Sequence, residues 1–79
     1  MNEIRLENTT VKKRECRKVY FRNIAIGLIY EEETQQWRYS SELKGEFWSL
    51  ETYEDSDSAC QALVDKRRSL DDYRLSQLK

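Results

Sequence analysis

The stretch GEFWSLETYEDSDSACQAL, from Gly45 to Leu63, contains the change of residue pattern that decides the fold. In EFWSLETY, apolar and polar residues alternate, so that Trp48 and Leu50 share one face of an extended chain. Acids and serines follow, and the next residues place alanines at the spacing of a helix face. The stretch therefore predicts a β-strand that leads directly into an α-helix.

The helix is predicted to begin near residue 55. Asp55 or Ser56 can serve as the N-cap, because a short side-chain oxygen there accepts a backbone N–H that lacks a partner within the helix. Asp57 places negative charge in the first turn, where the helix dipole favours it. One face is formed at helical spacing by Ala59, Ala62, Leu63, Lys66 and Leu70, widened by Cys60 and Val64. We expect this face to pack on a sheet.

Two more strands are predicted before this strand. The segment KVYFRNIAIGLIYEEE, which begins at Lys18, is rich in β-branched and aromatic residues. One of its faces is formed at period two by Ile24, Ile26, Leu28 and Tyr30. The polar EEETQQ lacks the Gly or Asn of a two-residue hairpin and predicts a longer loop. QWRYSSEL then alternates again, with Trp37, Tyr39 and Leu43 on the face expected to meet the helix. The sequence thus predicts an α+β fold (βββα), a three-stranded antiparallel β-meander packed against one C-terminal α-helix.

Length and charge divide the chain into two parts. Its 79 residues suffice for one domain. Residues 1–22 carry seven basic side chains against three acidic ones, whereas the remainder carries seven against twelve. We therefore predict a basic, mobile N-terminal arm over residues 1–17 and a single α+β domain over residues 18–79. Ile4 and Leu6 alternate with charged residues, which leaves a short edge strand within the arm as an alternative.

The residues for most catalytic and cofactor chemistry are missing from this sequence. The chain has no His, which removes the usual general base, the nucleophile–His pairs of hydrolases and the commonest zinc ligand. Its two glycines are too few for a phosphate-binding loop. We therefore predict a protein that is not an enzyme, with no catalytic residues, no metal, no cofactor and no small-molecule substrate.

Cysteine content and hydropathy predict a cytoplasmic protein with no membrane partner. Cys16 and Cys60 are the only cysteines, unlike the pattern of small disulfide-rich secreted domains. The longest apolar run, Ile24 to Tyr30, is far shorter than the ~20 residues of a membrane span. The N-terminus also lacks the apolar centre of a secretory signal. A Cys16–Cys60 disulfide and a reactive Cys16 thiol among basic neighbours are left open as alternatives.

Part of the chain resembles a DNA-binding module. In the AP2/ERF transcription factors of plants, and in the arm-type N-terminal domains of tyrosine integrases, a bulky strand residue and a turn glycine precede a Leu-x-Thr-aromatic, acids and Ala-x-x-Ala. Residues 24–66 are similar to this pattern at Trp37, Gly45, Leu50, Thr52, Tyr53, Asp55, Asp57, Ala59 and Ala62. The resemblance implies a three-stranded sheet with one helix, whose sheet face away from the helix carries Arg and Trp into the major groove.

Two functions follow from these observations, and they use different surfaces. On the sheet face away from the predicted helix, Arg38 stands beside three glutamates, a charge balance that disfavours a polyanion. We therefore predict a non-enzymatic protein-binding module, in which a protein partner or a second copy docks on this open face through Ile29, Arg38 and Phe47. The alternative is an accessory or regulatory nucleic-acid-binding protein similar to the AP2 and integrase arm domains. Its predicted phosphate contacts are Lys12, Lys13, Arg14, Arg17, Lys18, Arg22 and Arg38.

Overall fold

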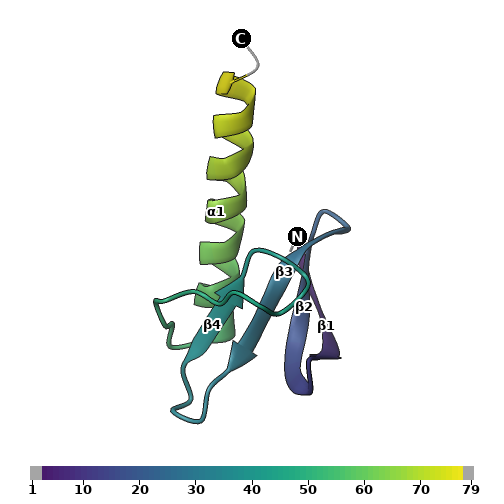
Figure 1. Cartoon of the computed structure of the whole chain (residues 1–79), viewed down its shortest axis with the longest axis vertical. Helices are drawn as coiled ribbons and strands as arrows, with labels where there is room; N and C mark the ends of the chain where they lie inside the picture. The colour runs from purple at the N-terminus through teal and green to yellow at the C-terminus, as the bar shows by residue number, and fades with distance from the viewer. Residues whose placement is uncertain (1–2, 78–79) are drawn as a thin grey trace.

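Four antiparallel strands and one helix make up the computed structural model, which describes residues 3–77 and the side chains of residues 3–68. The elements, in chain order, are β1 (Ile4–Val11), β2 (Arg14–Phe21), β3 (Ile24–Glu31), β4 (Trp37–Ser40) and α1 (Ser56–Gln77). The strands lie in the order β1-β2-β3-β4, and α1 packs against one side of the sheet, over β3 and β4 (Figure 1). The predicted α+β class, antiparallel sheet and C-terminal helix are confirmed, whereas the predicted number of three strands is wrong.

The additional strands come from the segment that was assigned to an N-terminal arm. β1 and β2 pair along their whole length, from Ile4 opposite Phe21 to Val11 opposite Arg14. Residues 4–11 and 14–17 of the predicted arm therefore lie in the sheet. The short edge strand that was left open as an alternative is a full strand of eight residues.

Two tight turns without glycine explain why these strands were missed. Lys12 and Lys13 have φ angles of 52° and 66°, and Arg22 and Asn23 have φ angles of 53° and 67°. Positive φ at both central residues is the geometry of a two-residue hairpin turn whose usual sequence is Asn-Gly or Asp-Gly. The Arg22–Asn23 turn also divides the predicted strand KVYFRNIAIGLIY between β2 and β3.

The predicted strand EFWSLETY belongs to the irregular connection between β4 and α1. Tyr53 exchanges two backbone hydrogen bonds with Trp37 as an isolated bridge, and the Ser49 N–H donates to the Tyr39 carbonyl oxygen at 2.7 Å. These bonds occupy the outer edge of β4 without adding a strand. Residues 41–52 are termed the crossing loop, because this connection passes across β3 on the face opposite α1 (Figure 1).

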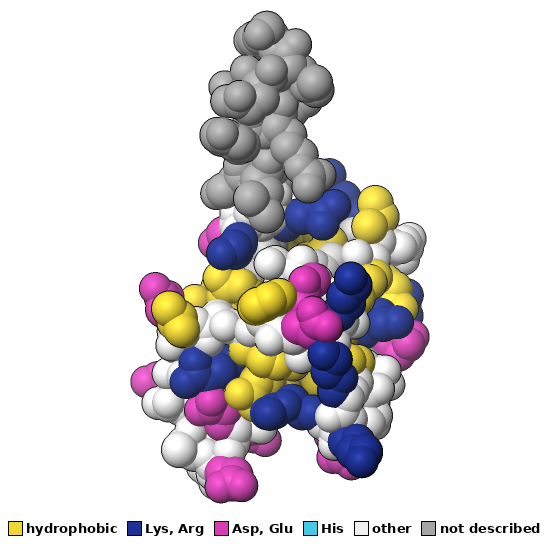
Figure 2. Space-filling model, viewed as in Figure 1, with side chains coloured by type: hydrophobic (Ala, Val, Ile, Leu, Met, Phe, Trp, Pro, Cys, Tyr) yellow, Lys and Arg dark blue, Asp and Glu magenta, His cyan; other side chains and the backbone are white. Residues whose placement is uncertain are grey.

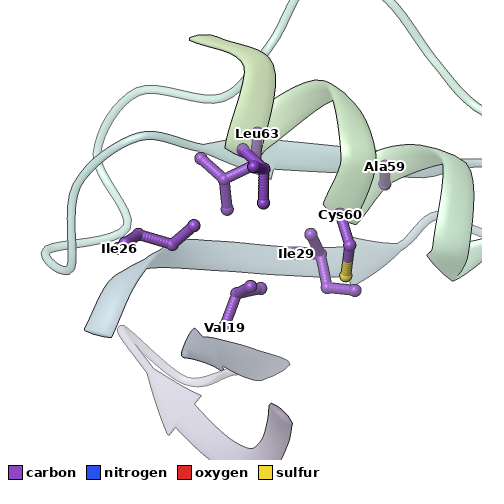
Figure 3. Close-up of a cluster of buried hydrophobic side chains, with 7 residues drawn as sticks. Val19, Ile26, Ile29, Ala59, Cys60 and Leu63 are labelled. Atoms are coloured by element: carbon purple, nitrogen blue, oxygen red, sulfur yellow. The ribbon is translucent and has the colours of Figure 1, made fainter. Parts of the chain in front are cut away.

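Apolar side chains on the two faces of the sheet form two separate clusters. The larger lies between the sheet and α1 and consists of Val19, Ile26, Ile29, Ala59, Cys60, Leu63 and Val64 (Figure 3). The smaller lies on the opposite face and consists of Cys16, Leu28 and Tyr30, with Val11 and Trp48 packed against it. The crossing loop therefore covers part of the face that the sequence was expected to leave open.

A bulge in β3 decides which of its residues face α1. The register of β2 against β3 shifts by one residue, which leaves an extra residue in β3 at Ile26. Because the alternation changes phase there, Ile26 and Ile29 both belong to the cluster beneath α1. Leu28 and Tyr30 belong to the opposite cluster. The single face that period-two alternation predicts is thus divided between the two sides of the sheet.

Gly27 lets β3, β4 and α1 approach one another closely. A Cβ atom at this position would lie 2.1 Å from the carbonyl oxygen of Ser40 and 3.0 Å from the side chain of Leu63. Any larger residue would therefore push apart the β3–β4 pair, since backbone atoms cannot move aside as a flexible side chain can.

The helix begins where the sequence predicts. Asp55 is its N-cap, because its Oδ1 accepts the backbone N–H of Ser58 at 2.7 Å. The side chains that α1 buries are Ala59, Cys60, Leu63 and Val64. Lys66, which was predicted on the same face, is exposed, and Leu70 lies outside the described side chains. The backbone of α1 continues well past the sheet (Figure 1).

Candidate protein-interaction site

Trp48 fixes the middle of the crossing loop to the sheet. Its ring meets the Tyr30 ring edge to face, with 4.5 Å between the centroids and 76° between the planes. The guanidinium carbon of Arg14 lies 4.2 Å from the Tyr30 centroid and 6.0 Å from the Trp48 centroid. Aromatic pairs and cation–π contacts each contribute about 0.5–1.5 kcal/mol. The three side chains together give the loop a defined position on the sheet.

Arg38 ties the C-terminal part of the crossing loop to β4. Its Nη1 donates to the carbonyl oxygens of Ser49 and Leu50, at 2.6 and 3.0 Å, and its Nε donates to the Glu32 carboxylate. That carboxylate also accepts from the Tyr30 hydroxyl at 3.2 Å. The hydrogen bond from Arg38 is the largest cause that lowers the pKa of Glu32 below its ordinary value. An ionised Glu32 therefore keeps the guanidinium directed at the loop.

Gly45 and Glu46 hold the N-terminal part of the crossing loop beside the β1–β2 turn. Gly45 has a φ of +70°, and a Cβ atom there would lie only 2.8 Å from Cγ1 of Val11. Glu46 forms an ion pair with Lys12, with 3.0 Å between Oε1 and Nζ. The loop is therefore attached at both ends and in its middle, although it has no regular secondary structure.

The crossing loop also exposes large apolar side chains to solvent. Phe47 is 72% exposed, Leu50 is 95% exposed and Leu43 is 44% exposed. Among the described side chains, the other large apolar residue that is exposed is Ile24, at 62%, beside the β2–β3 turn. Trp48 therefore packs inward while its neighbour Phe47 stays in water. Apolar side chains concentrated on one exposed segment are typical of an interaction site.

The three residues predicted to contact a protein partner have different environments. Ile29 is 0% exposed in the cluster beneath α1, so the prediction that it faces away from the helix is wrong. The cause is the bulge at Ile26, which reverses the alternation that the prediction assumed. Arg38 is half-buried and donates to Glu32 and to the crossing loop. Phe47 is the member of this set whose side chain is exposed.

The seven basic residues predicted to contact nucleic acid are spread over both faces and both ends of the sheet. Three form ion pairs with glutamates, namely Lys12 with Glu46, Arg22 with Glu3 and Arg38 with Glu32. Arg14 and Arg17 stack on aromatic rings on opposite faces of the sheet. Lys13 lies in the β1–β2 turn, and Lys18 lies within β2. On the face seen in Figure 2, basic and acidic side chains are interspersed around apolar ones.

Each face of the sheet contains one buried, free cysteine. Cys16 belongs to the cluster beneath the crossing loop, and Cys60 belongs to the cluster beneath α1. The alternative of a disulfide between them is therefore not realised. Burial raises the pKa of the Cys16 thiol, and burial raises the pKa of Cys60 to about 11. A raised pKa disfavours the thiolate, which argues against a reactive Cys16.

The part of the chain that the structure describes, residues 3–77, contains neither a metal-binding cluster nor a membrane-spanning helix. Within that part of the chain, no group of three or more Cys, Asp and Glu residues is placed to hold a metal ion. No helix there is long and apolar enough to cross a membrane.

Comparisons with known proteins give no match. No protein-family model matches the sequence, and comparisons with curated proteins and with solved structures give no significant match. The resemblance to the AP2/ERF and integrase arm domains therefore stays a prediction. The observed sheet has four strands, whereas that resemblance implies three.

Proposed function

We propose that the protein is a non-catalytic binding module that presents the crossing loop to another protein. The observation that carries this proposal is the exposure of Leu43, Phe47 and Leu50 on a single loop. A partner with an apolar pocket would remove these side chains from water, and each such burial favours binding. Phe47 is the largest of the three and is expected to be the main contact.

The attachments of the crossing loop support this role. Trp48 holds its middle on the sheet, and Arg38 donates hydrogen bonds to the carbonyl oxygens of Ser49 and Leu50. A loop that is already fixed loses less conformational entropy when a partner binds it. Arg38 is thus proposed as a positioning residue for the loop, and Phe47 as the contact residue.

Nucleic-acid binding is the alternative that receives less support from the geometry. Affinity for nucleic acid depends on neutralising phosphates with free basic side chains. Lys12, Arg22 and Arg38 are instead paired with glutamates. An interaction with nucleic acid would weaken steeply as salt is raised, whereas an apolar contact through Phe47 would change little.

Affinity capture from the native host, using the full chain with and without nuclease, tests the proposal. We expect the wild type to capture a protein in an amount that nuclease treatment does not change. Phe47→Glu should lower that amount roughly tenfold, because a charge in an apolar pocket costs desolvation energy. Ile24→Glu is the matched control, since it introduces the same charge at another exposed apolar residue outside the loop. That variant should capture as much partner as the wild type.

Two results would count against this function. Equal capture by the wild type and Phe47→Glu, with both chains folded by circular dichroism, contradicts a contact through the crossing loop. Loss of all captured protein after nuclease treatment, together with a steep salt dependence, supports the nucleic-acid alternative instead.

A further inference from the structure

Strand β1 is an unpaired edge of the sheet. It pairs with β2 on one side, and no described segment pairs with its other side (Figure 1). The opposite edge differs, because Ser49 and Tyr53 occupy the outer side of β4. β1 has eight residues, and its pairing with β2 shows no bulge. It also has no proline, and its charged side chains are those of Arg5 and Glu7.

The free backbone groups of this edge belong to the even-numbered residues of β1. Arg22 donates its N–H to the carbonyl oxygen of Glu3 at 2.9 Å, which makes these two a hydrogen-bonded pair in the β1–β2 register. Such pairs alternate along an antiparallel ladder, so the odd-numbered residues of β1 bond to β2. The N–H and C=O groups that point outward are those of Ile4, Leu6, Asn8 and Thr10.

We propose that β1 pairs antiparallel with β1 of a second copy of this chain, about a two-fold axis at Leu6. The two four-stranded sheets then form one continuous sheet. An axis perpendicular to the sheet keeps each face on its own side, so even-numbered residues lie opposite even-numbered ones. Leu6 lies opposite Leu6 of the second copy, and Ile4 lies opposite Asn8. Each of these pairs exchanges backbone hydrogen bonds through the outward groups.

Charge selects this register over its neighbours. With the axis at Leu6, Arg5 lies opposite Glu7 of the second copy, and Glu7 lies opposite Arg5. These positions alternate with the hydrogen-bonded pairs, so their side chains approach most closely. An axis at Arg5 or at Glu7 would place like charges opposite each other, which destabilises a strand pair. An axis at Asn8 would leave both charged residues opposite uncharged ones.

The apolar side chains on the side of β1 that faces α1 favour the same pairing. Because α1 lies over β3 and β4, the apolar side chains of Ile4 and Leu6 remain half-buried at the margin of the large cluster. Bringing the two Leu6 side chains together removes more of this apolar surface from water. Backbone groups, charges and apolar side chains of β1 are therefore all complementary to a second copy of β1.

Charge reversal at the edge tests the proposed dimer. Arg5→Glu and Glu7→Arg each replace opposite charges with like charges across the axis, and we expect each variant to dimerise roughly tenfold more weakly than the wild type. Mixing the two variants should restore a heterodimer, because residues 5 and 7 of one chain then face residues of opposite charge in the other. Sedimentation velocity over a concentration series measures all three samples.

Glu15→Arg is the matched control, since it changes the net charge equally at an exposed position of β2. It should dimerise like the wild type, and so should Phe47→Glu, which separates this proposal from the binding role of the crossing loop. A wild-type chain that sediments as a monomer up to about 100 μM overturns the proposal. So does a mixture of the two reversed variants that associates no better than either alone while both remain folded.

Discussion

The two faces of the sheet are covered by very different kinds of backbone. On one face, α1 satisfies its own backbone hydrogen bonds and can bury a purely apolar stripe that includes Leu63. On the other face, the irregular crossing loop must find partners for its carbonyl groups elsewhere. The half-buried guanidinium of Arg38 supplies two of them. A helix covers a sheet through apolar contact alone, whereas a loop needs polar anchors as well.

This difference assigns separate roles to the two faces. The cluster beneath α1 is larger and includes residues from β2, β3 and the helix, so it should dominate global stability. The cluster beneath the crossing loop is smaller, and Trp48 is the large side chain through which the loop packs on it. We therefore expect the loop face to open at a lower free energy than the helix face.

Truncation of a buried α1 side chain that faces the sheet should have the largest effect on stability. Leu63→Ala removes a fully buried side chain of α1 that lies directly over Gly27 of β3. We expect the free energy of unfolding to fall by about 3 kcal/mol. Lys66→Ala, an exposed substitution on the same helix, should change it by less than about 0.5 kcal/mol. Urea denaturation followed by circular dichroism measures both. Equal effects of the two variants would contradict a core centred beneath α1.

The two buried cysteines allow the faces to be compared directly. In single-cysteine variants made by Cys60→Ala or Cys16→Ala, we expect Cys16 to react with a thiol reagent roughly tenfold faster than Cys60 under native conditions. Opening of the crossing loop exposes Cys16, whereas Cys60 requires detachment of α1. The raised pKa of Cys60, about 11, slows its reaction further.

Adding Trp48→Ala to each single-cysteine variant checks the cause of the difference. It should speed the labelling of Cys16, because the loop loses its contact with Tyr30, and should change the labelling of Cys60 much less. In denaturant, where neither face exists, the two cysteines should react at similar rates. Native rates that are equal for Cys16 and Cys60 would show that both faces open in one cooperative event.

The helix and its contact with β4 could be predicted from sequence because each signal was local. The Asp55 cap and the alanine spacing lie within a few residues; the cap is seen in the structure, and Ala59 is buried against the sheet whereas Ala62 is partly exposed. The β1–β2 hairpin could not be predicted in this way, since its turn has lysines where the usual sequence has Asn-Gly. Its alternation of apolar and charged residues was nevertheless present in Ile4 and Leu6.

The candidate site was predicted less well because its residues depend on long-range packing. Phe47 was chosen correctly as an exposed residue, but for a strand that does not form. Leu43 and Leu50 were assigned to strand faces, although the largely polar run SELKGE between β4 and Phe47 already indicated a loop. Ile29 was misplaced because a bulge shifts the alternation at a point that no local pattern reveals.

Acidification should weaken one polar contact on each face of the sheet. We expect the resulting change in stability to be the smallest of those predicted. Arg38 lowers the pKa of Glu32 beneath the crossing loop, and the backbone N–H of Ser58 lowers the pKa of Asp55 at the start of α1. Because both values are lowered in the folded state, the stabilisation is complete above the unfolded values of about 4. It is lost as the pH falls through the folded values, so Tm should decrease by a few degrees between about pH 6 and pH 3.

Two substitutions separate the contributions of the faces to this decrease. Asp55→Asn keeps a capping oxygen but cannot titrate, so it should reduce the part of the pH dependence that comes from the helix. Glu32→Gln removes the ionised partner of Arg38 and should reduce the part of the pH dependence that comes from the crossing loop.

Limited proteolysis tests the crossing loop separately. Because the loop is expected to detach from the sheet more easily than α1, acid should make it sensitive to protease before Tm falls far. Glu32→Gln should already be cleaved in the loop at neutral pH. A loop that resists protease equally at both pH values, in the wild type and in Glu32→Gln, would mean that its other contacts, such as those of Trp48 and Glu46, hold it without the Arg38–Glu32 pair.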